Sequence, residues 1–310
     1  MIYKNTFKNK KIIVTGHTGF KGSWLTLWLL KLGAKVVGIS INNYIKQEVY
    51  KNYKNKNLKH LKLDITKKND LIKNIKKEKP DFIFHLAAQA LVKISYRDPS
   101  ETFLTNAIGT LNILESAREL KKSCNLILIT SDKVYKNFEI RRGYVESDIL
   151  GGDDPYSASK ACAELIIKSY VKSYFTKNKL LKITVARAGN VIGGGDWSKF
   201  RLVPDCIKAW KKNKTILIRN PNSTRPWQHV LDAIHGYLTL AHYIGKKNIH
   251  GQQFNFGPNN QISSKKVIQL VKEIKKNWNK IKWKIEKNKN KEKESSLLKL
   301  NSNKAKKIYQ

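Results

Sequence analysis

Short apolar runs alternate with longer amphipathic segments along the first 190 residues. The apolar runs have the length and composition of buried strands, whereas the segments between them repeat at helical spacing. The predicted strands are Lys11 to Thr15, Lys35 to Ser40, Leu58 to Ile65, Asp81 to Ala87, Asn125 to Ser131 and Lys182 to Ala188. Strands alternating with crossover helices predict an α/β fold, a doubly wound parallel sheet with a ligand crevice at the carboxyl ends of its strands.

A different pattern begins after Gly189. A glycine turn at residues 193–195, short elements and two prolines indicate a second, smaller C-terminal lobe. The predicted elements are a helix near Val203 to Lys212 and a strand from Thr215 to Arg219, then a helix from Val230 to Ile244 and a strand from Gln253 to Phe256 that return to the sheet. We therefore expect the sheet domain to comprise residues 1–189 with about 230–256, and the smaller lobe to comprise residues 190–229 and 257–310.

The chain is strongly basic. It has 61 Lys and Arg against 23 Asp and Glu, a formal net charge of +38, yet only eight of the cations are Arg. Proteins that recognise phosphates and base edges rely on the bidentate Arg fork, and no basic stripe interleaved with aromatic residues is present here. We therefore expect no nucleic-acid partner, although a basic nucleic-acid-binding protein is the non-enzymatic alternative that the charge leaves open. The positive field is expected to speed the arrival of an anionic substrate.

The cysteines and histidines have no spacing typical of a metal site or a disulfide framework. The residues concerned are Cys124, Cys162, Cys206, His85 and His229. We expect no metal and a reducing, cytoplasmic environment, with the two histidines in structural or polar-contact roles. The most apolar stretch, Trp24 to Leu30, is too short to cross a bilayer, and the chain begins without an apolar signal core, so no membrane association is expected.

A glycine-rich run from Gly16 to Gly22 follows the first predicted strand and opens a segment predicted to be helical from Ser23 to Leu32. Glycines there let the backbone approach a pyrophosphate, whose charge is favoured at a helix start. A plain tight turn is the alternative, but the position between first strand and first helix favours a dinucleotide site. The local sequence does not decide between NAD and NADP. Asp64, at the end of the third strand, is either a contact to the adenine edge or a helix N-terminal acid ahead of Thr66.

Tyr156 and Lys160 lie four residues apart at the start of a predicted helix, so their side chains share one face. An ammonium group beside a phenol is expected to lower the pKa of the phenol and make it a usable base. Chance alone predicts about two Tyr/Lys pairs at this spacing, and Tyr50/Lys54 and Tyr243/Lys247 occur as well. The pair at 156 is preferred because it opens a helix between the fifth and sixth strands.

The run from Thr130 to Lys133 ends the fifth predicted strand, where side chains reach the crevice. The hydroxyl of Ser131, the acid of Asp132 and the amine of Lys133 together suit orientation of a sugar oxygen, donation of a proton and removal of one. A simple Asx turn leading out of the strand explains the same residues, and the pattern by itself leaves both interpretations open.

Half of all arginines fall in or near the second lobe. They are Arg187, Arg201, Arg219 and Arg225. In a chain that otherwise uses Lys, this enrichment suggests planar recognition of a diphosphate. Ordinary ion pairing is the alternative and is expected for at least one of the four.

Taken together, these segments resemble the extended short-chain dehydrogenase/reductase family and, within it, the CDP-glucose 4,6-dehydratases. The resemblance covers nearly the whole chain. The runs that carry it are Val14 to Trp24, His85 to Gln89, Thr130 to Lys133, Asp154 to Ser157, Arg187 to Trp197 and Arg225 to Val230. It implies a Rossmann-like sheet domain, a nucleotide-diphosphate hexose as substrate and NAD as a cofactor that is not consumed. It also implies a homodimer through the helices Glu101 to Lys122 and Tyr156 to Thr176.

The resemblance assigns roles residue by residue. The catalytic residues implied are Ser131, Asp132, Lys133, Tyr156 and Lys160. The implied NAD contacts are Gly16, Thr18, Gly19, Phe20, Lys21, Gly22, Asp64, Ile65, Leu86, Ala87, Ala88 and Asn106, together with Tyr156 and Lys160. The implied substrate contacts are Gln89, Arg187, Asn190, Arg201, Arg219 and Arg225.

The implied reaction oxidises the sugar at C4, eliminates the 6-hydroxyl as water and reduces C6. Tyr156 would take the 4-hydroxyl proton and Asp132 would protonate the leaving hydroxyl. Relatives that act on dTDP-sugars carry Glu where this chain has Lys133, so Lys133 is our hypothesis for the base at C5. A nucleotide-sugar 4-epimerase is the alternative enzyme. Because relatives continue for several tens of residues beyond Gln310, an inactive truncated homologue is a further alternative.

Overall fold

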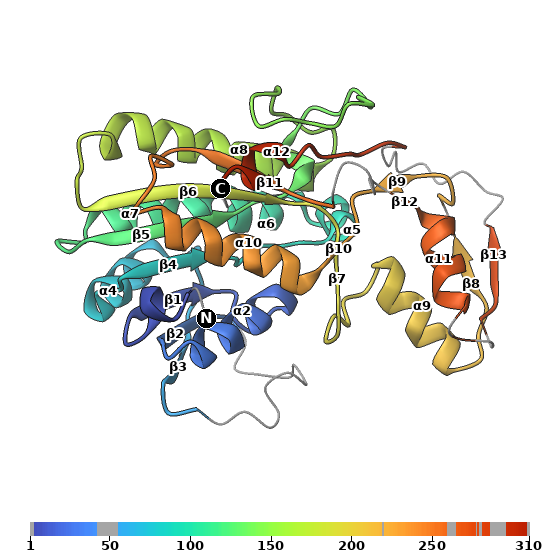
Figure 1. Ribbon diagram of the computed structural model, residues 1–310, viewed down its shortest axis with the longest axis horizontal. Coiled ribbons are helices and arrows are strands. Elements are labelled where there is room, and N and C mark those ends of the chain that lie inside the picture. Colours follow the sequence, from blue (N-terminus) through green and yellow to red (C-terminus); the bar gives the residue numbers. More distant parts are fainter. Residues whose placement is uncertain are drawn as a thin grey trace.

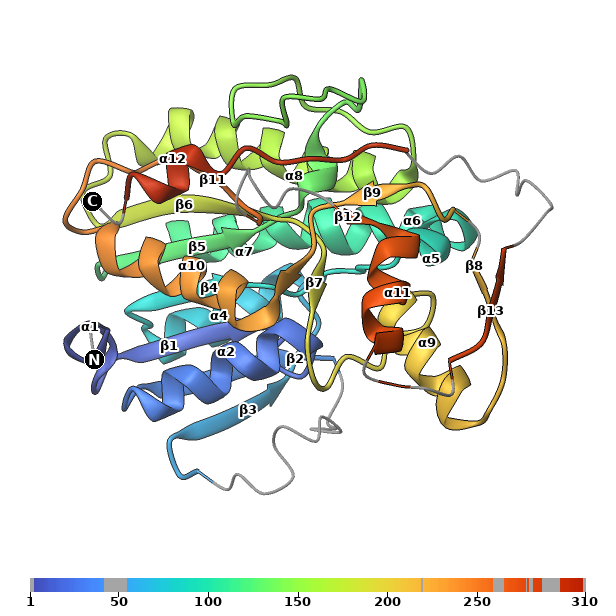
Figure 2. The ribbon, with the colours of Figure 1, turned by 45° about the vertical axis from the view of Figure 1, so that its right-hand side comes forward.

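The computed structural model describes most of the chain. The described residues are 3–41, 55–218, 220–258, 265–276, 278, 281–285 and 296–308. They form a large sheet lobe and a smaller lobe beside one end of the sheet (Figures 1 and 2). Within the described residues, no helix is long and apolar enough to span a bilayer.

The sheet lobe is built on seven parallel strands in the order β11-β6-β5-β4-β1-β2-β3. The strands are β1 (Lys11–Thr15), β2 (Lys35–Ser40), β3 (Leu58–Lys62), β4 (Phe82–His85), β5 (Cys124–Ile129), β6 (Leu181–Ala188) and β11 (Gln253–Phe256). The predicted doubly wound sheet is therefore confirmed, and Gln253–Phe256 joins it as the seventh strand. From β1 the chain adds β2 and β3 on one side and then β4, β5, β6 and β11 on the other, so the strand order reverses between β1 and β4, which is where such folds bind ligands.

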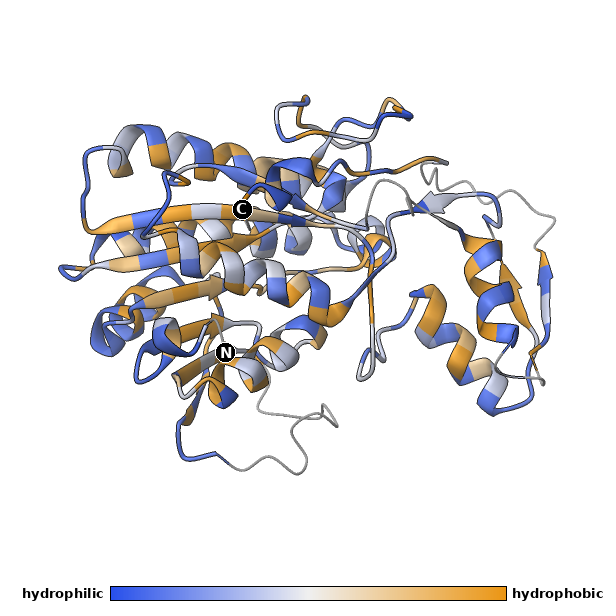
Figure 3. Cartoon of the chain, in the orientation of Figure 1, coloured by the Kyte–Doolittle hydropathy of each residue, from blue (hydrophilic) through white to orange (hydrophobic). Residues whose placement is uncertain are grey.

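Helices cover both faces of this sheet, and successive strand residues point to opposite faces. Ile12 and Val14 of β1 belong to one core with α2 and α10, whereas Ile13 belongs to the other core with α4, α7 and α8. Figure 3 shows the resulting pattern of largely apolar strands and amphipathic helices. The sheet-lobe helices are α1 (Lys4–Phe7), α2 (Phe20–Lys31), α4 (Lys68–Glu78), α5 (Val92–Arg97), α6 (Pro99–Phe103), α7 (Gly109–Arg118), α8 (Pro155–Tyr170), α10 (Val230–Tyr243) and α12 (Asn303–Lys306).

Each of the two helices predicted to be long contains a short π-helical turn, one in its middle and the other at its end. The predicted helix 101–122 consists of α6, a π turn at Leu104–Ile108 and α7, and α8 ends in a π turn at Val171–Phe175. A 3₁₀ turn at Asp132–Val134 follows β5. π-Helical turns of this kind occur often at functional sites.

The smaller lobe has a core of its own. Cys206, Trp210, Ile218, Val271 and Ile281 are buried together. They are held by the helices α9 (Leu202–Lys211) and α11 (Val267–Lys276) and the parallel pair β8 (Ile216–Ile218) and β13 (Trp283–Ile285). Two further pairs join β7 (Val191–Ile192) to β10 (Gln228–His229), and β9 (Thr224–Arg225) to β12 (Lys265–Lys266).

The end of the chain departs from the predicted boundary of the smaller lobe. Ala305 and Ile308 are buried in the sheet-lobe core, and α12 packs on β11. Lys247 Nζ donates a hydrogen bond to the Ile308 carbonyl at 2.8 Å. Residues 303–308 therefore belong to the sheet lobe, because apolar positions at 305 and 308 complete its core.

Candidate active site

The glycine turn after β1 brings the backbone unusually close to its neighbours. Gly16 has a φ of +71°, and a Cβ there would lie 2.8 Å from the Ala87 nitrogen. A Cβ on Gly22 would lie 2.1 Å from the Gly16 carbonyl oxygen. Helix α2 begins after Gly19, which has no side chain to cap it. The turn therefore presents the positive end of a helix at the switch point of the sheet, which suits a pyrophosphate.

Several residues predicted to contact the cofactor line the same end of the sheet. Asn106, in the π turn before α7, donates to the Gln89 carbonyl at 3.0 Å and to Ser159 Oγ at 2.9 Å, and it accepts the Gln89 N–H. Asn106 thereby fixes the loop after β4 that contains Leu86, Ala87 and Ala88. The hydrogen bonds of the Asn106 side chain are to Gln89 and Ser159, so its role in this structure is to hold that loop in place.

The residues on the other side of the switch point also make internal contacts. Asp64 Oδ1 accepts the Thr66 N–H at 2.9 Å, which forms a turn ahead of α4, a helix that begins after Lys67. Thr18 and Ser40 share a hydrogen bond of 2.6 Å between their hydroxyl groups. Ile65 packs so closely on Gly109 that a Cβ on that glycine would lie 2.6 Å from Ile65 Cδ1.

The turn after β5 concentrates a hydroxyl and a buried acid. Ser131 Oγ donates to Asp132 Oδ1 at 2.9 Å and accepts the Lys133 N–H at 3.3 Å. Asp132 is 2% exposed, and its other carboxyl oxygen has no hydrogen-bond partner within the described part of the chain. Burial raises the pKa of this carboxyl, although Lys133 and the bond from Ser131 oppose the shift. Asp132 is thus suited to hold a proton and donate it.

Tyr156 lies opposite this turn at the start of α8. Asp154 caps the helix by accepting the Ser157 N–H, and Tyr156 donates its own N–H to Ser95 Oγ at 3.1 Å. The buried Tyr156 hydroxyl hydrogen-bonds Ser131, and burial raises its pKa to about 12. Burial likewise lowers the pKa of Lys160 to about 8.

The expected lowering of the Tyr156 pKa is therefore wrong for the protein alone. Loss of hydration opposes the phenolate more strongly than the nearby cations favour it.

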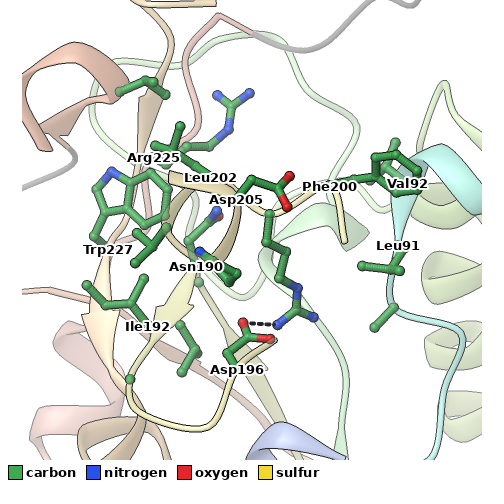
Figure 4. A pocket seen from close by; sticks show the side chains of 18 of the residues that line it. Leu91, Val92, Asn190, Ile192, Asp196, Phe200, Leu202, Asp205, Arg225 and Trp227 are labelled. Carbon is green, nitrogen blue, oxygen red and sulfur yellow. Dashed lines mark hydrogen bonds and ion pairs between the residues drawn. The ribbon is translucent and has the colours of Figure 1, made fainter. Parts of the chain in front are cut away.

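A cavity of about 380 Å³ joins these groups to the smaller lobe. Its lining includes Lys21, Ser131, Asp132, Lys133, Tyr156, Asn190, Arg201 and Arg225. Figure 4 shows Asn190, Arg225 and Trp227 on one side of the cavity and Leu91, Val92 and Phe200 on the other. Predicted catalytic residues from the sheet lobe and predicted substrate residues from the smaller lobe thus share one cavity.

Lys21 extends from α2 into this group of charges. Burial lowers its pKa to about 7, with further lowering by Arg201 and Lys160 and an opposing effect of Asp132. Its ammonium group lies 3.4 Å from the Tyr237 hydroxyl. Lys21 therefore faces the cavity as well as the glycine turn to which the sequence assigned it.

Arg187 is a correction to the predicted substrate contacts. Its side chain is 2% exposed and forms an ion pair with Glu164, and it donates to Tyr135 Oη at 2.7 Å. It is absent from the cavity lining because β6 directs it into the interior, where the buried Glu164 requires a counter-charge. We do not retain it as a substrate contact.

Another predicted substrate residue is placed differently. Gln89 is also absent from the cavity lining, and its amide bonds instead to the backbone of Leu91 and to Thr102. Arg219 lies outside the described residues. Asn190, Arg201 and Arg225 remain as the predicted substrate residues that line the cavity.

Sequence reasoning missed two groups at the cavity. Asp196 is buried and pairs with Arg201 through an Oδ2–Nη1 distance of 2.8 Å, drawn as a dashed line in Figure 4. Phe200 and helix α5 form another wall. The glycine run at 193–195 marked a turn there, but no pattern in the sequence indicated that this turn folds back on α5.

Buried His85 lies between two hydroxyl groups, Thr15 Oγ1 at 2.8 Å and Thr110 Oγ1 at 3.1 Å. Burial lowers its pKa to about 3. It holds β4 beside β1, which is the polar-contact role predicted for it. Across the described residues, no group of three or more His, Cys, Asp or Glu side chains is arranged to hold a metal ion.

Comparison with known proteins shows extensive similarity. The chain is 41% identical over 279 residues to CDP-glucose 4,6-dehydratase of Salmonella typhimurium, covering 87% of this chain and 77% of that protein. It is 28% identical over 292 residues to CDP-paratose 2-epimerase of Salmonella typhi, covering 84% and 82% of the two chains.

Solved structures show the same fold at lower identity. The epimerase Mth375 from Methanothermobacter thermautotrophicus superposes with a TM-score of 0.85 at 24% identity, covering 99% of this chain and 88% of that one. DesIV, a dTDP-glucose 4,6-dehydratase from Streptomyces venezuelae solved with NAD and TYD bound, gives 0.79 at 20% identity, covering 96% and 90%. Residues 13–309 match the profile of the GDP-mannose 4,6 dehydratase family. The chain therefore belongs to the GDP-mannose 4,6-dehydratase family.

Proposed function

We propose that the protein dehydrates CDP-D-glucose to CDP-4-dehydro-6-deoxy-D-glucose with NAD as a resident cofactor. The observation that carries the proposal is the cavity in which Tyr156, Asp132 and Lys133 face Arg201 and Arg225. An acid and an amine beside a tyrosine suit loss of water, whereas an epimerase needs no acid to expel a hydroxyl. The 41% identity to a CDP-glucose 4,6-dehydratase supports the same choice.

The residues at the glycine turn fit NAD. A Cβ on Gly16 or Gly22 would collide with the backbone of Ala87 or Gly16, so the glycines keep the turn tight and set the start of α2 at the switch point, where a pyrophosphate would bind. Gly16, Gly19 and Gly22 would hold the pyrophosphate, and Asp64, Ile65 and the loop fixed by Asn106 would flank the adenosine and nicotinamide halves. When bound, NAD would accept hydride from C4 and return it to C6, and its positive ring would favour the nearby phenolate.

Each proton transfer in the proposed reaction is assigned to a side chain of the protein. Tyr156, hydrogen-bonded to Ser131, takes the proton of the sugar 4-hydroxyl as C4 is oxidised. The new ketone acidifies the C5 proton, which the Lys133 amine removes. Asp132, whose buried carboxyl favours the protonated form, gives its proton to the 6-hydroxyl, which leaves as water. The ammonium of Lys133 returns a proton to C5 as C6 is reduced. The proton that Tyr156 took up then passes through Ser131 to Asp132, so protons and electrons balance and both groups are restored.

The assignment of Lys133 predicts a specific exchange defect. Lys133→Met should lose most turnover and should not incorporate solvent deuterium at C5, because Lys133 is the proposed base at that carbon. Mass spectrometry of the product formed in deuterium oxide measures this. Full turnover with normal deuterium entry at C5 would remove Lys133 from the mechanism.

The direct test of the proposed function uses four substrates. Purified protein with NAD is incubated with CDP-, dTDP-, GDP- and UDP-hexoses, and the product is followed by mass. Loss of one water from CDP-glucose, with a 4-keto product, is expected. A product of unchanged mass with inverted C4 would instead establish an epimerase, and bound NAD without turnover would establish an inactive homologue.

A homodimer and a cytoplasmic location are part of the proposal. Leu104 and Ile108 of the π turn before α7 are 42% and 40% exposed, and Leu165 of α8 is 55% exposed. These apolar side chains lie on the two helices through which the resemblance implies dimerisation. Leu165→Lys is expected to shift the protein to a monomer in light scattering, and an unchanged mass would contradict this interface.

A further inference from the structure

The loop that ends at Phe200 contains a strained backbone position. Phe200 has a φ of +63°, in the left-handed region that a bulky side chain rarely adopts. A residue held there costs folding free energy, so surrounding contacts must hold it in place. The same loop carries the buried Asp196 and is followed directly by Arg201, which both line the cavity.

The Phe200 ring is held from the opposite lobe. Lys93 Nζ and Arg97 Cζ of α5 each lie 5.4 Å from the ring centroid, which is the distance of a cation–π contact. Figure 4 places Phe200 beside Val92 of the same helix. The contact therefore crosses from the smaller lobe to the sheet lobe at the wall of the cavity.

Both ends of this contact touch the proposed reaction site. On the sheet-lobe side, Ser95 of α5 accepts the Tyr156 N–H at 3.1 Å. On the smaller-lobe side, Arg201 is paired with Asp196 at 2.8 Å. The left-handed turn at Phe200 thus sends the ring toward α5 while the next side chain, Arg201, turns toward Asp196 and the cavity.

We propose that Phe200 is a positioning residue that pins the 193–201 loop to α5 and thereby holds Arg201 over the cavity during the whole reaction cycle. The inference rests on the proposed function, because it concerns retention of the same nucleotide sugar. Oxidation at C4 and reduction at C6 use one cofactor molecule in turn. Each 4-keto intermediate that escapes between the two steps leaves one reduced cofactor behind.

The test compares variants that separate the ring from the backbone. Phe200→Ala removes the ring, Phe200→Gly also relieves the left-handed strain, and Phe200→Tyr keeps an aromatic face for both cations. Phe138→Ala is the matched control. Phe138 also makes a cation–π contact, with Lys136, but it is exposed and does not line the cavity.

In turnover, Phe200→Ala and Phe200→Gly should raise the KM for CDP-glucose about tenfold, the effect of losing two cation–π contacts. The KM for NAD should stay within about twofold because the glycine turn is unaffected. Both variants should accumulate reduced cofactor at 340 nm, whereas Phe200→Tyr and Phe138→Ala should behave as the parent protein. Unchanged KM and no accumulated reduced cofactor in Phe200→Ala would overturn the proposal.

Hydrogen exchange measures the same contact without any substrate. Amides of residues 193–205 should exchange faster in Phe200→Ala than in the parent protein, Phe200→Tyr and Phe138→Ala. If the parent protein converts none of the four nucleotide sugars, the proposed function fails, and this exchange result alone decides the loop contact. Equal exchange in all four proteins would then overturn it.

Discussion

The two lobes position their functional residues by different means. In the sheet lobe, Ser131, Asp132 and Tyr156 follow a strand or begin a helix within a seven-stranded parallel sheet that has a buried core on each face. In the smaller lobe, Arg225 lies in the two-residue strand β9 and Arg201 lies at the end of a loop, directly before α9.

This difference matches the roles proposed for the two lobes, which are proton transfer in the sheet lobe and substrate binding in the smaller lobe. Groups that move protons need fixed geometry to within a fraction of an ångström, and regular elements packed on both faces supply it. Groups that bind a charged ligand depend on loops and ion pairs, which are less rigidly supported. We therefore expect changes in the sheet lobe to abolish reaction steps and changes in the smaller lobe to weaken substrate binding.

The largest effect is expected for Tyr156→Phe. Loss of the phenol removes the base at the 4-hydroxyl, so turnover should fall by about 10³-fold or more, while NAD binding stays near normal. Steady-state kinetics and NAD titration measure the two quantities. Turnover within tenfold of that of the parent protein would contradict the proposed role of Tyr156 as the base.

Paired glycine variants compare the lobes directly. Gly22→Ala places a Cβ 2.1 Å from the Gly16 carbonyl and should weaken NAD binding by about 100-fold or prevent folding, which circular dichroism detects. Gly194→Ala in the smaller lobe meets nothing within 4 Å and should leave both NAD binding and the folded state unchanged. Equal behaviour of the two variants would contradict the rigid-turn interpretation.

Arg225→Met is expected to act on binding alone. Arg225 is 7% exposed at the cavity, and charge-assisted hydrogen bonds contribute about 1.5–3 kcal/mol each. The KM for CDP-glucose should rise about 10- to 100-fold with kcat nearly unchanged, and Arg225→Lys should recover only part of the loss because it lacks the planar fork. A fall in kcat without a change in KM would place Arg225 with the catalytic groups instead.

The smallest effect concerns stability and pH. The pKa of Lys160 is lowered to about 8 in the folded protein, below its unfolded value of 10.5. Between these two values the unfolded state binds the extra proton, so stability rises with pH, by at most about 3 kcal/mol. Between pH 8 and 10, the Tm of Lys160→Met should rise less than the Tm of the parent protein. The surface lysines titrate equally in both proteins, so they do not affect the difference. Identical slopes would contradict the buried, neutral-favouring environment of Lys160.

The pattern of the sequence determined the sheet lobe in advance, and it predicted which residues lie at the carboxyl ends of the strands. Continuous apolar runs such as 11–15 are typical of strands buried on both faces of a parallel sheet, and a glycine run between the first strand and the first helix favours a dinucleotide site. Local spacing also brought Tyr156 and Lys160 onto one helix face. These features depend on residues close in the chain, so a single sequence contains them.

Only the tertiary structure decided the features that depend on distant partners. Arg187 was assigned to substrate until the fold placed Glu164 beside it, and the pKa of Tyr156 rose because burial removed its water. Phe200 met α5 across the cavity, which no local pattern foretells. Hydration and long-range charge depend on everything packed around a group, and that packing exists only once the chain has folded.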